Sequence, residues 1–263
     1  MSALKTALEA PKSGSAPPLH IARFNAKYVA HIHTITAYTG FISALIVGIW
    51  LHYTKIVKNS SYGYPDEWFP SVSATIGDLY PERSIFQVAI AITSGPRFLL
   101  VFLNFVCAYK VGPKRAWGAL IAGLLRTLTC GGWVYITSTD DHDFHDIFMI
   151  SYMVLTIPWT VFVTGTTPLG TFLKKARFAT AFAFFAAIVP LVYWFIQHKV
   201  HVVAGAYSIY AYFEWALILL DVAFDAFSAI AFENIEIVIT TAGALVEFEP
   251  TTAVFEKKKK TLA

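Results

Sequence analysis

Six stretches of mostly apolar residues, each long enough to cross a bilayer, account for most of this chain. The hydrocarbon core of a membrane is roughly 30 Å thick, so a helix needs about 20 apolar residues to span it. We place the stretches at Ile32 to Leu51, Ile85 to Cys107, Ala116 to Thr137, Ile147 to Pro168, Ala179 to Ile196 and Tyr207 to Ala231. The sequence therefore predicts an all-α membrane protein, folded as a six-transmembrane-helix bundle.

The composition excludes a soluble domain. Of the 263 residues, 56% are hydrophobic and 14% are charged, whereas a soluble domain has about 25% charged residues. Cys107 and Cys130 both fall inside predicted spans, so a disulfide framework is not expected. The net charge of +3 comes mainly from the loops and from Lys257–Lys260, and no motif accompanies it, so we expect no nucleic-acid partner.

The charges of the loops predict the orientation of the bundle, because lysine and arginine accumulate on the cytosolic side of a membrane. Positive residues occupy the second and fourth loops between spans: Lys110, Lys114, Arg115, Lys174, Lys175 and Arg177. Acidic residues crowd the third: Asp140, Asp141, Asp143 and Asp146. We expect both termini in the cytosol and the acidic loop in the lumen.

The ends of the chain are expected to lie outside the bundle. Residues 1–27 are rich in proline and serine, contain no signal-peptide pattern and are predicted to be a flexible cytosolic tail. Residues 28–232 form the predicted membrane domain, with a luminal cap loop at residues 53–84. In the cytosolic tail at residues 233–263, Ile235, Ile237 and Ile239 alternate as in a strand, but no partner strand is evident, so we expect partial order.

The cap loop is the most distinctive segment. It runs YPDEWFPSVSATIGD from Tyr64 to Asp78 and continues through Tyr80–Arg83 into Ser94–Phe98. Its prolines restrain the backbone, so we expect a folded cap. Ser71 and Ser73 lack the Gly-x-Ser-x-Gly setting of a nucleophile elbow, which disfavours a serine hydrolase.

This loop resembles a family that remodels the lipid of glycosylphosphatidylinositol (GPI) anchors. The family includes the post-GPI-attachment reacylation factor and the N-terminal membrane domain of the fungal calcofluor-white-hypersensitivity protein, within the FRAG/DRAM/SFK superfamily. Weaker similarity extends from about Tyr28 to about Ile239, through Ser138–Asp146 and Ala204–Glu214. The loop is more similar to the fungal branch. The resemblance implies a multipass protein of the endoplasmic reticulum or Golgi membrane.

Ionisable residues inside the predicted spans need a partner, a cavity or a function, because each costs about 2.5–3.5 kcal/mol in a membrane. Glu214, Asp221 and Asp225 share one face of the last span, and Arg97 and Arg126 lie at comparable depth. The arginines and aspartates could pair and lock the bundle. Alternatively, they could line a cavity in which arginine binds the phosphate of a headgroup. Glu214, nearest the luminal end, is the better catalytic candidate.

The acidic loop DDHDFHD, from Asp140 to Asp146, is a second candidate site. It could be a solvated loop or a metal site, although its spacing matches no zinc motif. It could also hold a catalytic base, His145, oriented by Asp143 or Asp146. The resemblance favours His145, which aligns with a histidine of the family. We predict no metal and no cofactor.

Four charged residues of the cap loop allow two interpretations. Asp66, Glu67, Asp78 and Arg83 could contact glycan hydroxyls or phosphate, or they could pair with one another and close the cap.

The resemblance implies exchange of an acyl chain or ceramide on the anchor, with GPI-anchored proteins and membrane phospholipid or ceramide as partners. A non-catalytic alternative is an escort subunit that presents anchors to a separate transferase. A third is a structural membrane protein of the related autophagy-modulator type. The fungal relatives carry a further phosphatase-like half, which suggests a separate phosphatase-like subunit as another partner.

Overall fold

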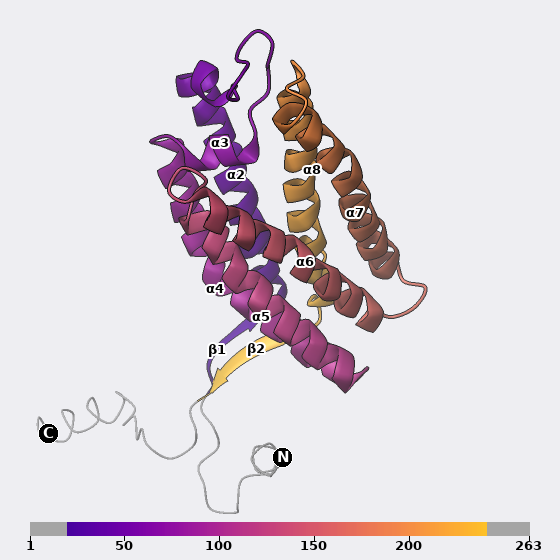
Figure 1. The fold of residues 1–263 in the computed structure, drawn as a ribbon. Helices are drawn as coiled ribbons and strands as arrows, with labels where there is room; N and C mark the ends of the chain where they lie inside the picture. Colours follow the sequence, from indigo (N-terminus) through magenta and orange to yellow (C-terminus); the bar gives the residue numbers. More distant parts are fainter. Residues whose placement is uncertain (1–19, 241–263) are drawn as a thin grey trace, which may run out of the picture. The chain divides into compact units, whose positions relative to one another are not determined.

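A computed structural model describes residues 20–240 of the chain. One compact unit, Asn25–Ile235, is a bundle of helices (Figure 1). Its long helices are α2 (Lys27–Ile56), α4 (Glu82–Tyr109), α5 (Pro113–Tyr135), α6 (His142–Thr166), α7 (Phe172–Lys199) and α8 (Ala206–Ala226). Two short helices are α3 (Val72–Gly77) and α9 (Ser228–Ala231). Each predicted span therefore overlaps a long helix, and the sixth extends past the end of α8 through α9.

The membrane character of the bundle is confirmed for part of the predicted spans. Four helices are long and apolar enough to cross a membrane: α2, α4, α6 and α7. The other two long helices, α5 and α8, carry charged side chains within their apolar stretches, and these lower their mean hydropathy. These are Arg126 in α5 and Glu214, Asp221 and Asp225 in α8.

The helices pack unevenly around the bundle. Helix α2 packs against α4, α4 against α5, α5 against α6, and α7 against α8, whereas α6 and α7 share few contacts. Aromatic side chains from different helices fill the centre, with Phe41, Phe86, Trp133, Tyr152 and Trp215 among them. Of the side chains of α7, only Arg177, Phe184 and His198 are buried. The lightly packed seam between α6 and α7 leaves room for a cavity.

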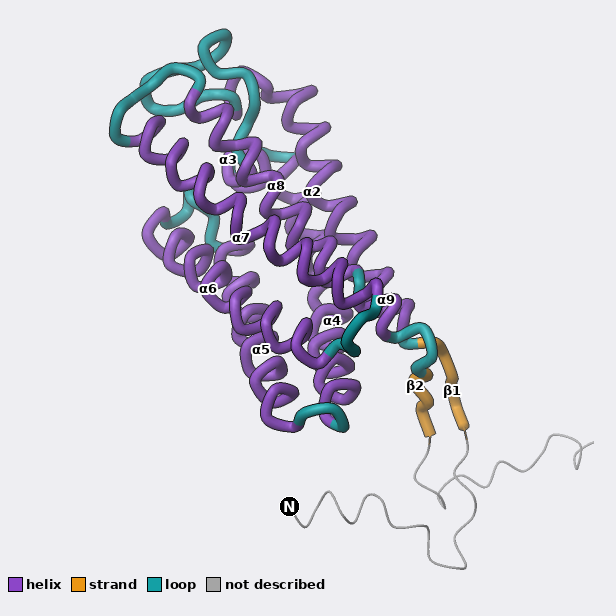
Figure 2. The backbone as a smooth tube through the Cα atoms, turned by 90° about the vertical axis from the view of Figure 1, so that its right-hand side faces the viewer, coloured by secondary structure: helices purple, strands orange, loops and turns teal. Residues whose placement is uncertain are grey.

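The predicted cap is present as a folded loop between α2 and α4, at the loop-rich end of the bundle in Figure 2. We call this end the cap end. Helix α3 begins after Ser71, whose hydroxyl accepts a hydrogen bond from the N–H of Ala74. The Trp215 indole donates to the carbonyl oxygen of Pro70 at 3.0 Å. The N–H of Ser71 donates to the Tyr207 hydroxyl at 3.0 Å. The cap is thus attached to α8.

Glu67 is the main anchor of this attachment. Its side chain is fully buried, and its carboxylate accepts hydrogen bonds from the N–H of Gly205, the N–H of Ser208 and the Ser208 hydroxyl at 3.1, 2.9 and 2.7 Å. The first N–H groups of a helix have no partner within the helix and favour a negative charge. Glu67 therefore caps α8 from a distant loop.

Gly205 makes the junction between α7 and α8 possible. Its φ of 78° lies in the left-handed region, where other residues are strained. A Cβ atom at this position would lie 2.8 Å from the Trp68 ring of the cap.

The segments that flank the bundle form a small sheet that the sequence did not predict. β1 (His20–Asn25) and β2 (Glu236–Thr240) pair into a two-stranded sheet, with an ion pair between Arg23 and Glu236. The strand-like alternation at Ile235–Ile239 therefore has a partner, in a region expected to be flexible tail. The lysine run at 257–260 lies outside the described residues.

We predict that Glu67→Ala loosens the cap. The substitution leaves the N-terminal N–H groups of α8 buried without an acceptor. A hydrogen bond to a charged group contributes about 1.5–3 kcal/mol, so the free energy of unfolding should fall by at least about 2 kcal/mol. Thermal unfolding of the purified protein in detergent measures the loss.

Asp66→Ala is the matched control, because Asp66 is the exposed neighbour of Glu67 in the same loop. Equal stability of the two variants would contradict the anchoring role of Glu67.

Candidate functional site

Two hollows meet at the cap end of the bundle. The inner cavity lies between α6, α7 and α8 and is lined mainly by apolar side chains, among them Trp133, Met153, Phe184 and Leu217. The vestibule is a wider groove of about 1310 Å³ with a polar lining that includes Lys58, Asp78, His142 and Lys199. Both hollows are lined by Ser73, His145, Met149, Leu191 and Tyr210. The shared residues mark the junction between a polar and an apolar compartment.

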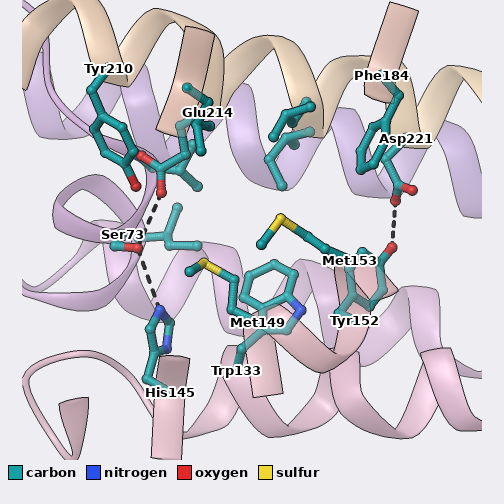
Figure 3. A pocket seen from close by; sticks show the side chains of 15 residues that line it. Ser73, Trp133, His145, Met149, Tyr152, Met153, Phe184, Tyr210, Glu214 and Asp221 are labelled. Atoms are coloured by element: carbon teal, nitrogen blue, oxygen red, sulfur yellow. Dashed lines mark hydrogen bonds between the residues drawn. The ribbon is translucent and has the colours of Figure 1, made fainter. Parts of the chain in front are cut away.

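Three polar side chains from three helices converge at this junction (Figure 3). The Ser73 hydroxyl of α3 lies 3.3 Å from Oε1 of Glu214 in α8 and 3.5 Å from Nε2 of His145 in α6. The other oxygen of Glu214 accepts the N–H of Val72 at 2.7 Å. We call Ser73, His145 and Glu214 the reaction cluster. Glu214 thus orders the start of α3 and presents Ser73 to the imidazole.

The backbone sets the tautomer of His145. Its Nδ1 lies 2.8 Å from the carbonyl oxygen of Ile136. A carbonyl oxygen only accepts, so in the neutral imidazole Nδ1 carries the hydrogen and Nε2 carries the lone pair. The imidazole is buried, and its Nε2 faces Ser73 at the junction. His145 is therefore oriented as a proton acceptor.

The acidic neighbours of His145 have other roles. Asp141 caps α6 by accepting the N–H of Phe144. Asp146 lies 3.7 Å from His142, one turn away, and Asp143 is exposed. The Ile136 carbonyl occupies the orienting position that we expected for Asp143 or Asp146. No group of three or more histidine, cysteine or acidic residues within residues 20–240 is arranged to hold a metal ion.

The floor of the inner cavity rests on a buried charge cluster. The Tyr152 hydroxyl donates to Asp221 at 2.5 Å, as Figure 3 shows at the opposite end from the reaction cluster. Asp221 also pairs with Arg126, whose guanidinium donates to Asp225 at 3.0 Å and to the Thr156 hydroxyl at 3.0 Å. Arg126 thus bridges α5, α6 and α8.

Arg97 and His33 complete the charge cluster. Arg97 donates to the Tyr152 hydroxyl at 2.5 Å and lies 3.9 Å from Asp225. His33 lies 3.7 Å from the same carboxylate. Of the two interpretations of Arg97, Arg126 and Asp221, the structure favours the ion pairs. Asp221 alone among these three also lines the inner cavity.

The charged residues of the cap loop separate into different environments. Glu67 is buried under the cap, and Asp66 is exposed. Arg83 pairs with Asp140 of the loop before α6, which joins the cap to that loop. Asp78 lines the vestibule. Of the four, Asp78 is therefore the one placed to meet a ligand in the vestibule.

The vestibule changes the titration of one of its carboxyl groups. Asp78 reaches solvent but has protein on several sides, and this reduced solvation raises the pKa of its carboxyl to about 6, against the opposing effect of Lys58 and Arg83. Across the cap, a hydrogen bond from Thr137 and the nearby Arg83 lower the pKa of Asp140. Asp78 changes charge close to neutral pH, whereas Asp140 stays ionised.

The helical bundle corresponds to a known family. A family model, the Frag1/DRAM/Sfk1/Cwh43P N-terminal domain, matches residues 25–235, and these include the reaction cluster, the inner cavity and the vestibule. The chain belongs to this family. The similarity noted in the cap loop is confirmed and extends through the bundle of this Frag1/DRAM/Sfk1/Cwh43 protein.

Individual relatives point in the same direction. The chain is 45% identical over 237 residues to "Protein cwh43" of Schizosaccharomyces pombe, an alignment that covers 90% of this chain and 24% of the relative. It is 25% identical over 218 residues to "Acyltransferase PGAP2" of Xenopus tropicalis, covering 77% and 86%. It is 24% identical over 224 residues to "Post-GPI attachment to proteins factor 2" of Caenorhabditis elegans, covering 78% and 84%. A search of solved structures finds no significant match.

The coverage differs between these relatives. The chain spans only 24% of the length of the fission yeast protein, whereas it spans 86% of the frog acyltransferase.

Ser73 and Tyr210 are the site residues that the sequence did not single out. Ser73 stands in the distinctive loop, but no nucleophile motif surrounds it. One signal could have identified Ser73. It lies in the first turn of a short helix, where the backbone N–H groups need an acceptor such as a nearby carboxylate. Tyr210 lies beside Glu214 in Figure 3, one helical turn before it in α8.

We predict that Arg126→Met disrupts the bundle. The variant leaves Asp221 and Asp225 buried without their main counterion, and breaking a buried pair costs about 3–5 kcal/mol. Thermal unfolding in detergent should show a large loss of stability. Arg115→Met, which removes an exposed arginine from the same helix, should have little effect, and equal losses would contradict the interpretation.

We predict that Asp78→Asn changes how stability depends on pH. Because the folded state holds this proton to about pH 6 and an unfolded aspartate only to about pH 3.9, ionisation of Asp78 lowers stability as pH rises through this range. The variant should be more stable than wild type at about pH 7.5 and similar near pH 4, as measured by thermal unfolding. Asp143→Asn, at an exposed position, is the control. A stability difference between Asp78→Asn and wild type that stays the same across this pH range would contradict the raised pKa of Asp78.

Proposed function

We propose that this chain remodels the lipid of GPI anchors by transferring an acyl chain at the junction of the vestibule and the inner cavity. The reaction cluster at this junction is the observation on which the proposal rests. The relatives support it, since they include a protein named an acyltransferase and proteins named for a step after GPI attachment.

The two hollows suit an amphiphilic substrate. An apolar cavity favours a hydrocarbon chain, and a polar groove favours an inositol-phosphate or glycerol group. Leu191 of α7 and Met149 of α6 border both, so a lipid entering along the seam between these helices would place its ester or hydroxyl beside the reaction cluster. Lys58 and Lys199 in the vestibule supply positive charge for a phosphate.

The hydrogen-bond count at the cluster leaves one acceptor free. Ser73 has a single hydroxyl hydrogen, and both Glu214 and the Nε2 of His145 compete for it. The shorter distance, 3.3 Å, is to the carboxylate. The Nε2 lone pair is then available to a hydroxyl group that enters from the vestibule.

The chemical step follows from this arrangement. The hydroxyl of a lyso-anchor gives its proton to Nε2 of His145 while its oxygen forms a bond to the acyl carbonyl carbon of a donor ester. The bond between that carbon and the donor oxygen breaks, and Nε2 returns the proton to the leaving oxygen. Glu214 engages the Ser73 hydrogen and so leaves the Nε2 lone pair free for the entering hydroxyl. In a ceramide exchange the same base would accept the proton of the ceramide hydroxyl, whose oxygen bonds to the anchor phosphorus while the bond from phosphorus to the diacylglycerol oxygen breaks and that oxygen takes the proton.

The surrounding membrane arrangement is part of the proposal. We place six spans across an endoplasmic reticulum or Golgi membrane, with the vestibule on the luminal side and both termini in the cytosol. The loops rich in lysine and arginine support this orientation. The substrates are then GPI-anchored proteins and membrane phospholipid or ceramide.

We predict that His145→Ala lowers the acyl-transfer rate by at least about 100-fold, because general acid–base catalysis contributes about 10²- to 10⁴-fold. The measurement is anchor lipid composition by mass spectrometry in cells that lack the native protein. His31→Ala is the control, since His31 is an exposed histidine of α2 that lines neither hollow. Normal anchor lipids in the His145→Ala cells would refute the mechanism.

An assay of the purified chain distinguishes catalysis from an escort role. With a lyso-anchor and an acyl-donor phospholipid in detergent, an enzyme turns over without a second protein. Binding of the lyso-anchor with no transfer would instead establish the escort alternative.

A further inference from the structure

A buried arginine without a carboxylate partner lies at the end of the bundle opposite the vestibule. Arg177, in the second turn of α7, is 3% exposed. Its guanidinium donates to the Thr167 hydroxyl at 2.7 Å and to the Ser228 hydroxyl at 3.2 Å. Its buried Nε has no hydrogen-bond partner. Within residues 20–240, both other buried arginines, Arg97 and Arg126, lie within ion-pair distance of an aspartate, whereas Arg177 does not.

The buried arginines and aspartates described so far therefore leave a net positive charge. Arg97, Arg126 and Arg177 face only two buried aspartates, Asp221 and Asp225, and both aspartates are engaged by the charge cluster. A charged side chain in an apolar environment is costly unless it is paired. Hydroxyl groups satisfy hydrogen bonds of Arg177 but leave its charge uncompensated. The missing partner is an anion.

A pocket of about 1070 Å³ opens at Arg177. Its polar lining comes from α4, the end of α6, the α6–α7 connection and α7: Asn104, Cys107, Thr166, Thr167, Thr171 and Arg177. Apolar residues, including Val111, Phe172 and Ile230, complete the lining, and these three are exposed at the surface. Helix α7 begins in this pocket, and the positive end of its dipole adds to the attraction for an anion.

We propose that this pocket binds the phosphate of an anionic phospholipid headgroup, with Arg177 as the central contact. A guanidinium pairs with phosphate oxygens in a planar, two-bond geometry. The apolar rim suits the attached acyl chains. The site is separate from the reaction cluster and does not depend on the proposed function.

A lipid bound there would steady the helix that the bundle holds least. α7 has few contacts with α6, and Arg177 links it to α9 through Ser228. Ser228 also accepts a hydrogen bond from Asn104 of α4 at 3.3 Å. The headgroup would therefore join α4, α7 and α9 and hold α7 in place along the seam that leads to the inner cavity.

Thermal unfolding of the purified full chain in a neutral detergent tests the site. The additives are phosphatidylinositol, phosphatidylcholine and inorganic phosphate, each alone. At about 100 times its Kd, a ligand specific for the folded state should raise the Tm of a protein of this size by about 5 °C or more. We expect phosphatidylinositol to produce this rise in wild type and in Lys175→Met, which removes an exposed charge from the same helix, and not in Arg177→Met.

The stability without lipid is a second readout. Removing an uncompensated buried charge should leave the Tm of Arg177→Met equal to or above that of wild type, in contrast to Arg126→Met. A rise with inorganic phosphate alone, lost in Arg177→Met, would support the anion site and assign it to free phosphate. An equal rise with phosphatidylcholine, an equal rise in Arg177→Met, or no rise with either anion would overturn the proposal.

Discussion

The need to compensate the carboxylates of α8 organises this bundle. Asp221 and Asp225 are neutralised by Arg126 and Arg97, which reach them from α5 and α4. Glu214, two turns earlier, is satisfied by the start of α3 and by Ser73. One helix thus fixes both the middle of the bundle and the position of the cap. Since a buried charge cannot be left without a partner in a membrane, these contacts permit little freedom in how the elements are arranged.

The same constraint divides the polar interior into parts with different roles. The arginines and aspartates of the charge cluster neutralise one another. The cluster therefore supports the cavity floor and has little capacity to bind a ligand. The reaction cluster holds two acceptors and a single hydroxyl hydrogen, so it can receive a proton donor. At the opposite end, no carboxylate among the described residues lies within ion-pair distance of Arg177, and its Nε has no hydrogen-bond partner. We therefore propose that stability, reaction and lipid binding depend on three separate groups of residues along one bundle.

Hydropathy alone predicted where the helices lie, and the spacing of the acidic residues in the last span predicted that they share a face with arginine partners. The contact between Ser73 and Glu214 was not accessible in this way, because the two residues are 141 positions apart in the chain. The bond between His145 and the Ile136 carbonyl was not predicted, for a local reason. Asp141 starts α6, so adjacent residues point about 100° apart around the helix, and of residues 142–146 only His145 is buried. The pairing of β1 with β2 joins distant segments whose individual patterns are weak.

The most direct test of the account is the reactivity of a cysteine placed at position 73. In a Ser73→Cys chain whose Cys107 and Cys130 are replaced by alanine, the rate of labelling by a charged thiol reagent is measured with and without a lyso-GPI anchor. The account predicts labelling through the vestibule and strong protection by the anchor, with no protection by a soluble sugar phosphate that lacks an acyl chain. Labelling that the anchor does not slow, in a chain that still binds the anchor, would contradict a substrate site at the junction of the vestibule and the inner cavity.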